Sequence, residues 1–382
     1  MRCAYCVYNE DFKGKRNHGT NHMSLSTAYR AIDYLHQHSF KRDKVAISLY
    51  GGEPTLQFPL IQSCVSYANS LLKGKQIDLT ITTNGILLTP EMAEFFCKHD
   101  FNVYVSIDGP EEINDSYRVD AKGGGSFQRA VQGLKYLVDA YGKLSNEKVG
   151  FSMVYTPPFS GKRIDRIAEL WDELPWIPGG TNLNITYPTP GTILAEKVLK
   201  ESLEEDKNLQ LWSYERYRDK YTGKDESHPI ADAIMEKAMA QLMQRPIFSE
   251  PLDQKFLNGC CIPGVRRVFV TADGRFRLCE KISSDAPLIG NINDGIDMDV
   301  IKKLYLGEYE SMCAPVCSRC WAVNLCNSCF TEAFQDGRLD PKYMTNRCYN
   351  TKKTQERYLE YYCSLREYKP EGLNYLYKLK LS

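Results

Sequence analysis

The chain has 382 residues, more than one ordinary core holds, so two domains or one large barrel with an appendage are expected. Lys plus Arg and Asp plus Glu number 48 each, and this neutral balance lacks the basic footprint of a nucleic-acid-binding protein. The longest apolar stretches, such as 45–50, are far too short to span a bilayer, and the N-terminus has no apolar signal region. We therefore expect a cytoplasmic protein that binds neither nucleic acid nor membrane.

Helical and strand patterns alternate between residues 25 and 187. A helix face with Leu25 in it follows Ser24, and a β-rich run at 45–50 ends at the glycine pair 51–52. Further strands are expected at 79–83, 102–107, 148–155 and 183–187, and further helices after Thr89-Pro90, after the cap residue Ser126 and over 164–174. Repeated βα units of this length imply a parallel sheet with helices outside, either open or closed into a barrel.

The second half of the chain changes character twice. Residues 188–258 are polar with mainly helical patterns, and from residue 259 the chain is rich in Cys, Gly and short strands, as in small domains held together by metal. Residues 351–365 again have a helical pattern. The expected segments are a barrel over 1–187, a helical bridge over 188–258, a metal-binding domain over 259–350 and a helical tail over 351–382.

Cysteine usage is the unusual feature of the composition. The chain has 14 cysteines, of which two stand at the start and nine lie between Cys260 and Cys348. Disulfides would need an oxidising compartment, and tight C-x2-C pairs in a cytoplasmic chain favour metal or redox sites. Cys64, Cys97 and Cys363 stand in helical patterns without partners, so we expect them to be small buried hydrophobic residues.

The chain opens with the pattern C-x-aromatic-C. A C-x2-C pair alone leaves zinc, a redox pair and chance open. Cys3, Tyr5 and Cys6 match the last three fixed positions of the C-x3-C-x-aromatic-C motif, and here the chain resembles the radical S-adenosylmethionine (SAM) superfamily. In that family three thiolates hold a [4Fe–4S] cluster and leave one iron open to chelate SAM. The resemblance places Tyr5 with the cofactor-binding residues.

The first cysteine of this motif would fall two residues before Met1. In the family the motif also follows the first barrel strand, so the resemblance implies an α/β fold, a partial (β/α)6 TIM-like barrel with its first strand missing. We therefore expect an N-terminally truncated fragment or a mis-assigned start, with further sequence upstream such as a peptide-binding domain. Expressed alone, this fragment is expected not to cleave SAM.

Two further segments match the family in the expected order. Gly51, Gly52 and Glu53 precede Pro54 directly after an expected strand, as in the family's GGEP motif. Glycines let a backbone approach a ligand closely, and the resemblance implies that Glu53 accepts hydrogen bonds from the SAM ammonium. The alternative is a simple Gly-Gly turn with a solvated Glu.

The second of these segments surrounds the end of the strand at 102–107. The resemblance implies that Ser106 and Asp108 bond the sugar or the methionine moiety of SAM, that Asn84 does so from the preceding strand end, and that Arg118 pairs with the SAM carboxylate. The alternative for Arg118 is a surface residue. Ligands bind at the C-terminal ends of the strands in such sheets.

The C-terminal cysteines form a second constellation, made of Cys260, Cys261, Cys279, Cys313, Cys317, Cys320, Cys326, Cys329 and Cys348. Their spacing resembles the SPASM domain of radical SAM peptide maturases, except that two residues rather than three separate Cys326 from Cys329. The resemblance implies one auxiliary [4Fe–4S] cluster on Cys317, Cys320, Cys326 and Cys348. It implies another on Cys261, Cys279 and Cys329, with Cys260 or Cys313 as fourth ligand. The rival interpretation of such pairs is a zinc ribbon.

The resemblance also implies a chemistry. The N-terminal cluster would reduce SAM to a 5′-deoxyadenosyl radical, an electron donor such as flavodoxin or ferredoxin would supply the electron, and the substrate would be a precursor peptide. Glu280 follows Cys279 directly and is either a base that takes the substrate proton or a solvated side chain.

Short stretches around Cys6, Cys261 and Cys279 are similar to maturases that form thioether bridges in ribosomally made peptides. The favoured function is therefore a peptide maturase that installs a thioether or another crosslink. Two alternatives stay open: a formylglycine-forming anaerobic sulfatase maturase, and a non-catalytic zinc or Fe–S binding protein.

Overall fold

The computed structural model describes residues 1–6, 8, 19–157, 160–177, 182–188, 209–224, 228–245, 261–330, 333–335 and 337–379. The chain divides into two compact units. The first runs from Met1 to Leu209 and includes Thr271–Gly274, and the second comprises Gln210–Val270 and Arg275–Ser382. The finer division into four segments, expected from the sequence, stays a prediction.

The first unit is built on one parallel sheet. Its strands are β1 (Lys44–Leu49), β2 (Gln76–Thr83), β3 (Asn102–Val105), β4 (Val149–Val154) and β5 (Asn182–Thr186). Each strand pairs with the next along the chain, in the order β1-β2-β3-β4-β5. This arrangement confirms the predicted α/β fold with a partial barrel. Strand β2 begins three residues earlier than the pattern at 79–83 predicts, because Gln76–Asp78 continue the pairing with β1.

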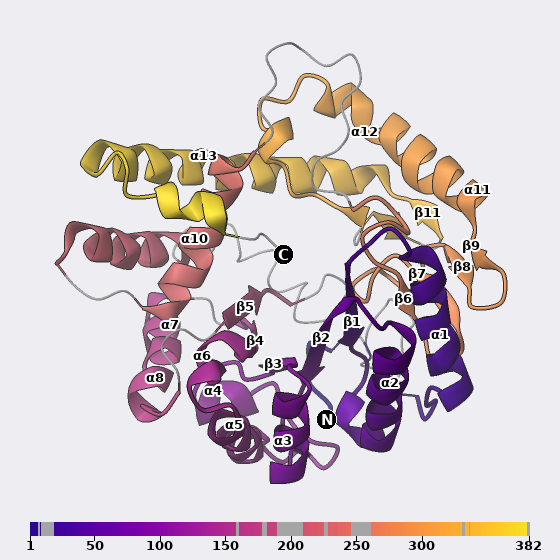
Figure 1. The fold of residues 1–382 in the computed structure, drawn as a ribbon. Coiled ribbons are helices and arrows are strands. Elements are labelled where there is room, and N and C mark those ends of the chain that lie inside the picture. The colour runs from indigo at the N-terminus through magenta and orange to yellow at the C-terminus, as the bar shows by residue number, and fades with distance from the viewer. Residues whose placement is uncertain are drawn as a thin grey trace. The chain divides into compact units, whose positions relative to one another are not determined.

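Helices connect the strands and lie along the outer side of the sheet (Figure 1). They are α1 (Leu25–His38), η1 (Pro54–Gln57), α2 (Phe58–Leu71), α3 (Pro90–Lys98), α4 (Glu111–Asp115), α5 (Phe127–Tyr141), η2 (Gly142–Leu144), α6 (Ser145–Lys148), α7 (Gly161–Ala168) and α8 (Leu170–Glu173). The predicted start signals of two helices are confirmed. Ser24 accepts a hydrogen bond from the Thr27 amide, and Thr89 accepts one from the Met92 amide.

Helix α5 begins differently from the prediction. Ser126 stands at the cap position, but its hydroxyl donates to the Arg118 carbonyl over 2.7 Å instead of capping the helix. The cap comes from Asp115, whose Oδ1 accepts the amides of Ser126 and Phe127 over 2.8 and 2.9 Å. The helix predicted over 164–174 is likewise two short helices, α7 and α8.

Two side chains that were expected inside the protein lie at its surface. Leu25 is 47% exposed in the first turn of α1, and Cys363 is exposed on the last long helix. Helices are present at both places as predicted, but these two residues lie on exposed positions of them. Cys64 and Cys97, which were also expected to be buried, are both half-buried, and Cys64 packs against a small core cluster that includes Ile32 and Ala68.

The second unit contains short elements and longer helices. Residues 209–222 are helical. The further elements are α10 (Pro229–Met243), β6 (Phe269–Val270), β7 (Arg275–Arg277), β8 (Gly290–Asn291), β9 (Gly295–Ile296), α11 (Met298–Val300), η3 (Ile301–Glu308), α12 (Tyr309–Cys317), η4 (Val323–Leu325), β10 (Phe334–Gln335), β11 (Arg338–Leu339), α13 (Pro341–Tyr368) and η6 (Asn374–Lys378). Strands β6 to β9 form an antiparallel sheet in chain order. The helix predicted over 351–365 is part of the longer α13.

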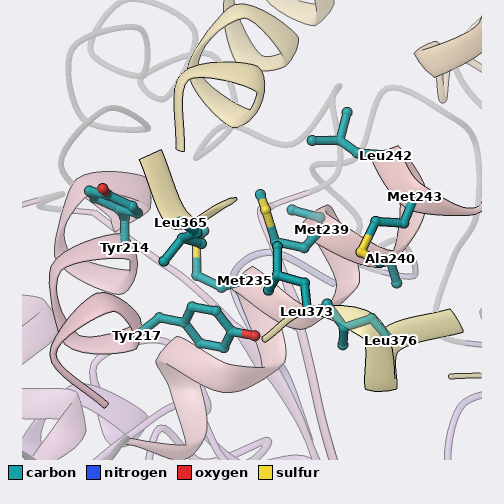
Figure 2. Packing of buried hydrophobic residues seen from close by; sticks show 11 residues of the cluster. Tyr214, Tyr217, Met235, Met239, Ala240, Leu242, Met243, Leu365, Leu373 and Leu376 are labelled. Atoms are coloured by element: carbon teal, nitrogen blue, oxygen red, sulfur yellow. The ribbon is translucent and has the colours of Figure 1, made fainter. Parts of the chain in front are cut away.

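The core of the second unit is rich in Tyr, Met and Leu side chains. Figure 2 shows residues from α10, from α13 and from the segment after α13 packed around Met235 and Met239. Leu373 and Leu376 of that last segment are fully buried. Gln244 donates to the carbonyl oxygens of Leu376 and Leu379 over 2.7 and 2.8 Å, so the segment is fixed to the end of α10. None of the described helices is both long and apolar enough to cross a bilayer.

Candidate functional site

The N-terminal residues lie against the segment that follows α4. The Arg2 amide donates to the Val119 carbonyl over 2.7 Å, and the Ala4 amide donates to the Tyr117 carbonyl over 2.9 Å. A turn then brings the Cys6 amide to the Cys3 carbonyl over 3.0 Å. The cysteine loop, Cys3–Cys6, is therefore held by backbone hydrogen bonds on both sides of Cys3.

Tyr5 joins the cysteine loop to the end of β3. Its hydroxyl donates to Asp108 Oδ2 over 2.5 Å and accepts from Arg118 Nη1 over 2.7 Å. Tyr5, Asp108 and Arg118 are all buried. The other carboxylate oxygen of Asp108 accepts the Val154 amide at the end of β4 over 2.9 Å. Asp108 and Arg118, which were expected to contact SAM, thus make their hydrogen bonds to the cysteine loop and the sheet.

Burial shapes the acid–base behaviour of the loop. It raises the pKa of the Cys3 thiol, while the nearby positive charge of Arg118 opposes the rise. Burial also raises the pKa of the Asp108 carboxyl, again against the opposing effect of Arg118. A bare thiolate is costly in this environment. A metal ion that takes the place of the thiol proton would remove that cost.

Glu53 ties the glycine turn after β1 to the end of β2. Its Oε1 accepts from the Thr55 amide (3.1 Å), the Thr55 hydroxyl (2.6 Å) and the Thr83 hydroxyl (2.7 Å), and its Oε2 accepts the Asn84 amide (2.7 Å). A carboxylate has about four lone-pair sites, two on each oxygen, so Oε2 can still accept another donor. A Cβ atom at Gly51 or Gly52 would meet nothing within 4 Å, so the backbone here borders open space.

The sheet brings the remaining expected cofactor residues to one edge. The side chain of Asn84 accepts the Ile86 amide over 3.0 Å directly after β2. The Ser106 amide donates to the Thr83 carbonyl over 2.9 Å directly after β3. Asn84, Ser106 and Asp108 therefore follow the C-terminal ends of two neighbouring parallel strands, where ligands bind in such folds.

Three residues of this edge were missed by sequence reasoning. Thr83 anchors Glu53, and Asn114 accepts the Asp108 amide over 3.2 Å. Arg163 lies after β4 and donates to the Thr156 hydroxyl over 2.8 Å, while its buried Nε has no hydrogen-bond partner in the described part of the chain. Only the position of Thr83 at the last residue of a β-rich run could have indicated its role.

Part of the C-terminal constellation converges in the second unit. Burial raises the pKa of the Cys348 thiol, and negative charge on neighbouring thiols adds to the rise; these neighbours are Cys317, Cys326 and Cys320. Burial also raises the pKa of Cys279, and charges on Glu280 and Cys329 add to it. The three cysteines near Cys348 are the residues that the family resemblance assigns, together with Cys348, to one auxiliary cluster.

The remaining expected ligands are placed as follows. Cys313 is buried and hydrogen-bonds to Cys317, which lowers the pKa of the Cys317 thiol to about 7. Cys261 is half-buried, and Cys260 lies outside the described residues. Within the described ranges, no three His, Cys, Asp or Glu side chains come close enough together to hold a single metal ion.

Glu280, the expected base, is held by an arginine. Arg267 Nη1 lies 3.3 Å from each carboxylate oxygen of Glu280. The side chain of Glu280 is 18% exposed and that of Arg267 is 46% exposed. Glu280 is therefore neither fully solvated nor buried, and its carboxylate is oriented beside Cys279.

The family of the first unit follows from a family model. Residues 1–171, which contain the cysteine loop, the glycine turn and the buried Tyr5 contacts, match the model of the radical SAM superfamily. Residues 1–171 form a radical SAM domain. Members of this superfamily bind a [4Fe–4S] cluster and SAM, and Cys3 and Cys6 of this domain are both free cysteines.

Curated relatives align with part of the chain. A serine-type anaerobic sulfatase-maturating enzyme of Bacteroides thetaiotaomicron is 35% identical over 140 residues, 36% of this chain and 33% of that protein. The radical SAM cyclopropyl synthase TigE of Paramaledivibacter caminithermalis is 28% identical over 162 residues, 40% of this chain and 32% of that protein. The aligned stretches thus span about a third of the length of these relatives.

Solved structures resemble the chain over nearly its whole length. Native anSMEcpe with bound AdoMet gives a TM-score of 0.68 at 17% identity, and the match covers 99% of this chain and 96% of that chain. The same protein with bound AdoMet and the Kp18Cys peptide gives 0.64 at 17% identity, with the same coverage. At this level of identity the likeness establishes the fold.

Proposed function

We propose that this protein is a radical SAM peptide maturase with auxiliary iron–sulfur clusters. The observation that carries the proposal is the match of residues 1–171 to the radical SAM superfamily, in a chain whose second unit holds a further set of free cysteines. A radical SAM domain needs only the cluster of its own loop. A second set of thiols indicates additional redox centres, whose potential the protein can tune by burial and hydrogen bonds.

We infer iron–sulfur clusters rather than zinc at the C-terminal thiols, because the chain also has a radical SAM domain, and domains of that family hold such a cluster. Cys279 and Cys329, with Cys261 and one of Cys260 or Cys313, are proposed to hold one of these auxiliary clusters.

The residues of the sheet edge are proposed to bind SAM. Cys3 and Cys6 would hold the N-terminal cluster with a third thiolate, the open turn at Gly51-Gly52 would receive SAM, and the free lone pair on Glu53 Oε2 would accept its ammonium. Asn84 and Ser106 would contact the sugar or the methionine moiety. When bound, the cluster and SAM supply a 5′-deoxyadenosyl radical that takes a hydrogen atom from the substrate.

The proposed substrate is a ribosomally made precursor peptide, and the proposed product is a thioether or another crosslink. The relative TigE, named a cyclopropyl synthase, and anSMEcpe, solved with a bound peptide, support chemistry on peptides. Glu280, oriented by Arg267 beside Cys279, is proposed to take the substrate proton. An electron donor such as flavodoxin or ferredoxin would supply the electron.

Formylglycine formation is the second candidate. It is favoured by the 35% identity with a serine-type anaerobic sulfatase-maturating enzyme. In that case the substrate would be a sulfatase segment with a Ser or Cys to be oxidised, and Glu280 would serve the same proton transfer.

Reconstitution of the intact gene product under anaerobic conditions tests the proposal. We expect about twelve irons per chain, since three clusters hold four each. With SAM and a reductant, the protein should release 5′-deoxyadenosine. Zinc without acid-labile sulfide, or iron that supports no SAM cleavage, would disprove the radical SAM function.

The two candidate products are separated by mass spectrometry and by carbonyl labelling. A Cys-containing precursor peptide that becomes crosslinked loses two hydrogen atoms, keeps its sulfur and does not react with a hydrazide. A sulfatase peptide that becomes formylglycine gains an aldehyde that does react. A Glu280→Gln variant should lower product formation more than 5′-deoxyadenosine release, because the proton leaves after hydrogen abstraction. If product formation and 5′-deoxyadenosine release fall equally, Glu280 is not the base that takes the substrate proton.

A further inference from the structure

Tyr5 lies between Cys3 and Cys6 in the sequence of the cysteine loop. Its hydroxyl hydrogen-bonds to two ionisable side chains, Asp108 and Arg118. A phenol can donate one hydrogen bond and accept others. Tyr5 uses both capacities, since it donates to Asp108 Oδ2 over 2.5 Å and accepts from Arg118 Nη1 over 2.7 Å. The ring is therefore fixed by two directional, charge-assisted contacts.

Burial makes these contacts hard to exchange for water. Tyr5 is 8% exposed, Asp108 2% and Arg118 6%. An ionic group buried without a partner is costly, so loss of the phenol leaves both Asp108 and Arg118 worse satisfied. Asp108 is itself fixed to β4 by the Val154 amide, so the phenol is held to the sheet and not to a mobile side chain.

The backbone around Tyr5 is attached at the same place. The amides of Arg2 and Ala4 donate to the carbonyls of Val119 and Tyr117, the two neighbours of Arg118 in sequence. The Arg118 carbonyl in turn accepts the Ser126 hydroxyl over 2.7 Å. Cys3 thus lies between two backbone attachments, and the Tyr5 side chain adds a third.

We propose that Tyr5 is a positioning residue that fixes the cysteine loop on the ends of β3 and β4, and that Asp108 and Arg118 act on the N-terminal cluster through the Tyr5 hydroxyl. This inference rests on the proposed function, which places that cluster on Cys3 and Cys6. It assigns to Arg118 a role besides the expected carboxylate binding, because one of its five N–H donors meets the phenol in a buried place.

A Tyr5→Phe variant of the intact, reconstituted gene product tests the inference. The variant keeps the ring and removes only the hydroxyl. The SAM-induced change in the EPR spectrum of the reduced protein reports the N-terminal cluster, because only that cluster has an iron without a thiolate. We expect this signal to broaden and to decay roughly tenfold faster under a chelator, the factor that corresponds to one hydrogen bond to a charged group.

Tyr117→Phe is the matched control. It removes a phenol hydroxyl that donates to the Pro157 carbonyl over 3.0 Å, while the backbone carbonyl of Tyr117 still accepts the Ala4 amide. This variant should keep the wild-type EPR signal and chelator resistance. A general loss of packing would affect both variants alike, whereas the positioning role affects Tyr5→Phe alone. Equal behaviour of the two variants would overturn the inference.

Arg118→Lys separates action through Tyr5 from contact with SAM. If Arg118 acts through Tyr5, the single variant reproduces the EPR change of Tyr5→Phe, and the double variant is no worse than Tyr5→Phe. If Arg118 instead binds the SAM carboxylate, Arg118→Lys weakens SAM binding to the same degree in the wild-type protein and in the Tyr5→Phe protein. The resistance of the cluster to the chelator is then unchanged. That second outcome would overturn the inference.

The proposed function and this inference fail in different ways. A wild-type protein without any SAM-responsive EPR signal would refute the proposed function. A wild-type protein with that signal, accompanied by a Tyr5→Phe variant with the same spectrum and the same resistance to chelation, would refute only the positioning role of Tyr5.

Discussion

The positions of individual residues in the radical SAM domain were predictable where the residue directly follows a strand. Asn84 and Ser106 stand directly after β2 and β3, and sequence periods locate strand ends well enough to place them at one edge. The partners of Tyr5 were not predictable. Asp108 and Arg118 lie 103 and 113 residues away along the chain, and only the folded sheet brings them to the phenol.

Thr83 provides a prediction at the scale of one side chain. Its hydroxyl donates to Glu53 Oε1 over 2.7 Å and accepts the Gly85 amide over 3.1 Å, and Thr83 is buried. Thr83→Val keeps the shape and removes both contacts, so we expect a loss of about 1–3 kcal/mol in the free energy of unfolding. SAM binding should weaken as well, because Glu53 loses one of the groups that orient it.

Thr80→Val on the same strand is the control for this measurement. Thr80 is half-buried, and valine suits a strand at least as well as threonine. Chemical denaturation and SAM titration of both variants should show a loss only for Thr83→Val. Equal stability of the two variants would mean that Glu53 does not depend on the Thr83 hydroxyl.

At the scale of elements, the order and type of the long periodic segments were predictable, whereas their exact ends were not. The five strands match the predicted runs, because apolar alternation is a local property. The cap of α5 is supplied by Asp115, eleven residues before Ser126, through a folded loop. Such a contact replaces the local Ser cap without any local signal.

The approach of α5 to the turn after β2 gives a prediction about packing. A Cβ atom at Gly133 would lie 2.2 Å from the Gly85 carbonyl oxygen and 3.1 Å from Leu88 Cβ. Backbone cannot yield as a side chain can, so Gly133→Ala should cost about 1–3 kcal/mol, although alanine is the better helix former. Thermal and chemical unfolding of the variant check this value.

Gly161 is the matched control, since it begins α7 and a Cβ atom there meets nothing within 4 Å. Gly161→Ala should leave the free energy of unfolding unchanged or raise it by up to about 1 kcal/mol. A Gly133→Ala variant as stable as Gly161→Ala would show that α5 can shift away from the turn.

At the scale of the whole molecule, the chain length predicted a division into two parts, but the sequence did not predict where the boundary lies. Residues 210–270 belong to the same unit as the cysteine-rich region. Their membership depends on a core in which Tyr214, Met239 and Leu376 meet from three distant segments. Long-range packing of this kind leaves no periodic trace in a single sequence.

Glu236, a half-buried carboxyl of the second unit, provides a prediction about pH. Burial raises the pKa of Glu236, although the hydrogen bond from Tyr375, 2.6 Å long, opposes the rise. The folded state therefore keeps a proton that the unfolded state releases, so stability is fully present below the ordinary Glu pKa and falls as the pH rises through the folded pKa. One proton accounts for at most about 1.4 kcal/mol per pH unit.

Hydrogen exchange of the α10 amides, compared between wild type and Glu236→Gln at several pH values, measures this dependence within the second unit. The difference in α10 exchange protection between wild type and Glu236→Gln should change with pH in the mildly acidic range. At lower pH this difference should stay constant. A constant difference throughout would mean that Glu236 titrates alike in both states.

The way Gln244 holds the carbonyls of Leu376 and Leu379 has a consequence for biosynthesis. The core of the second unit cannot be complete until Leu373 and Leu376 have left the ribosome. The cysteines from Cys261 to Cys348 precede these residues in the chain, so they are synthesised before that core can close around its last segment.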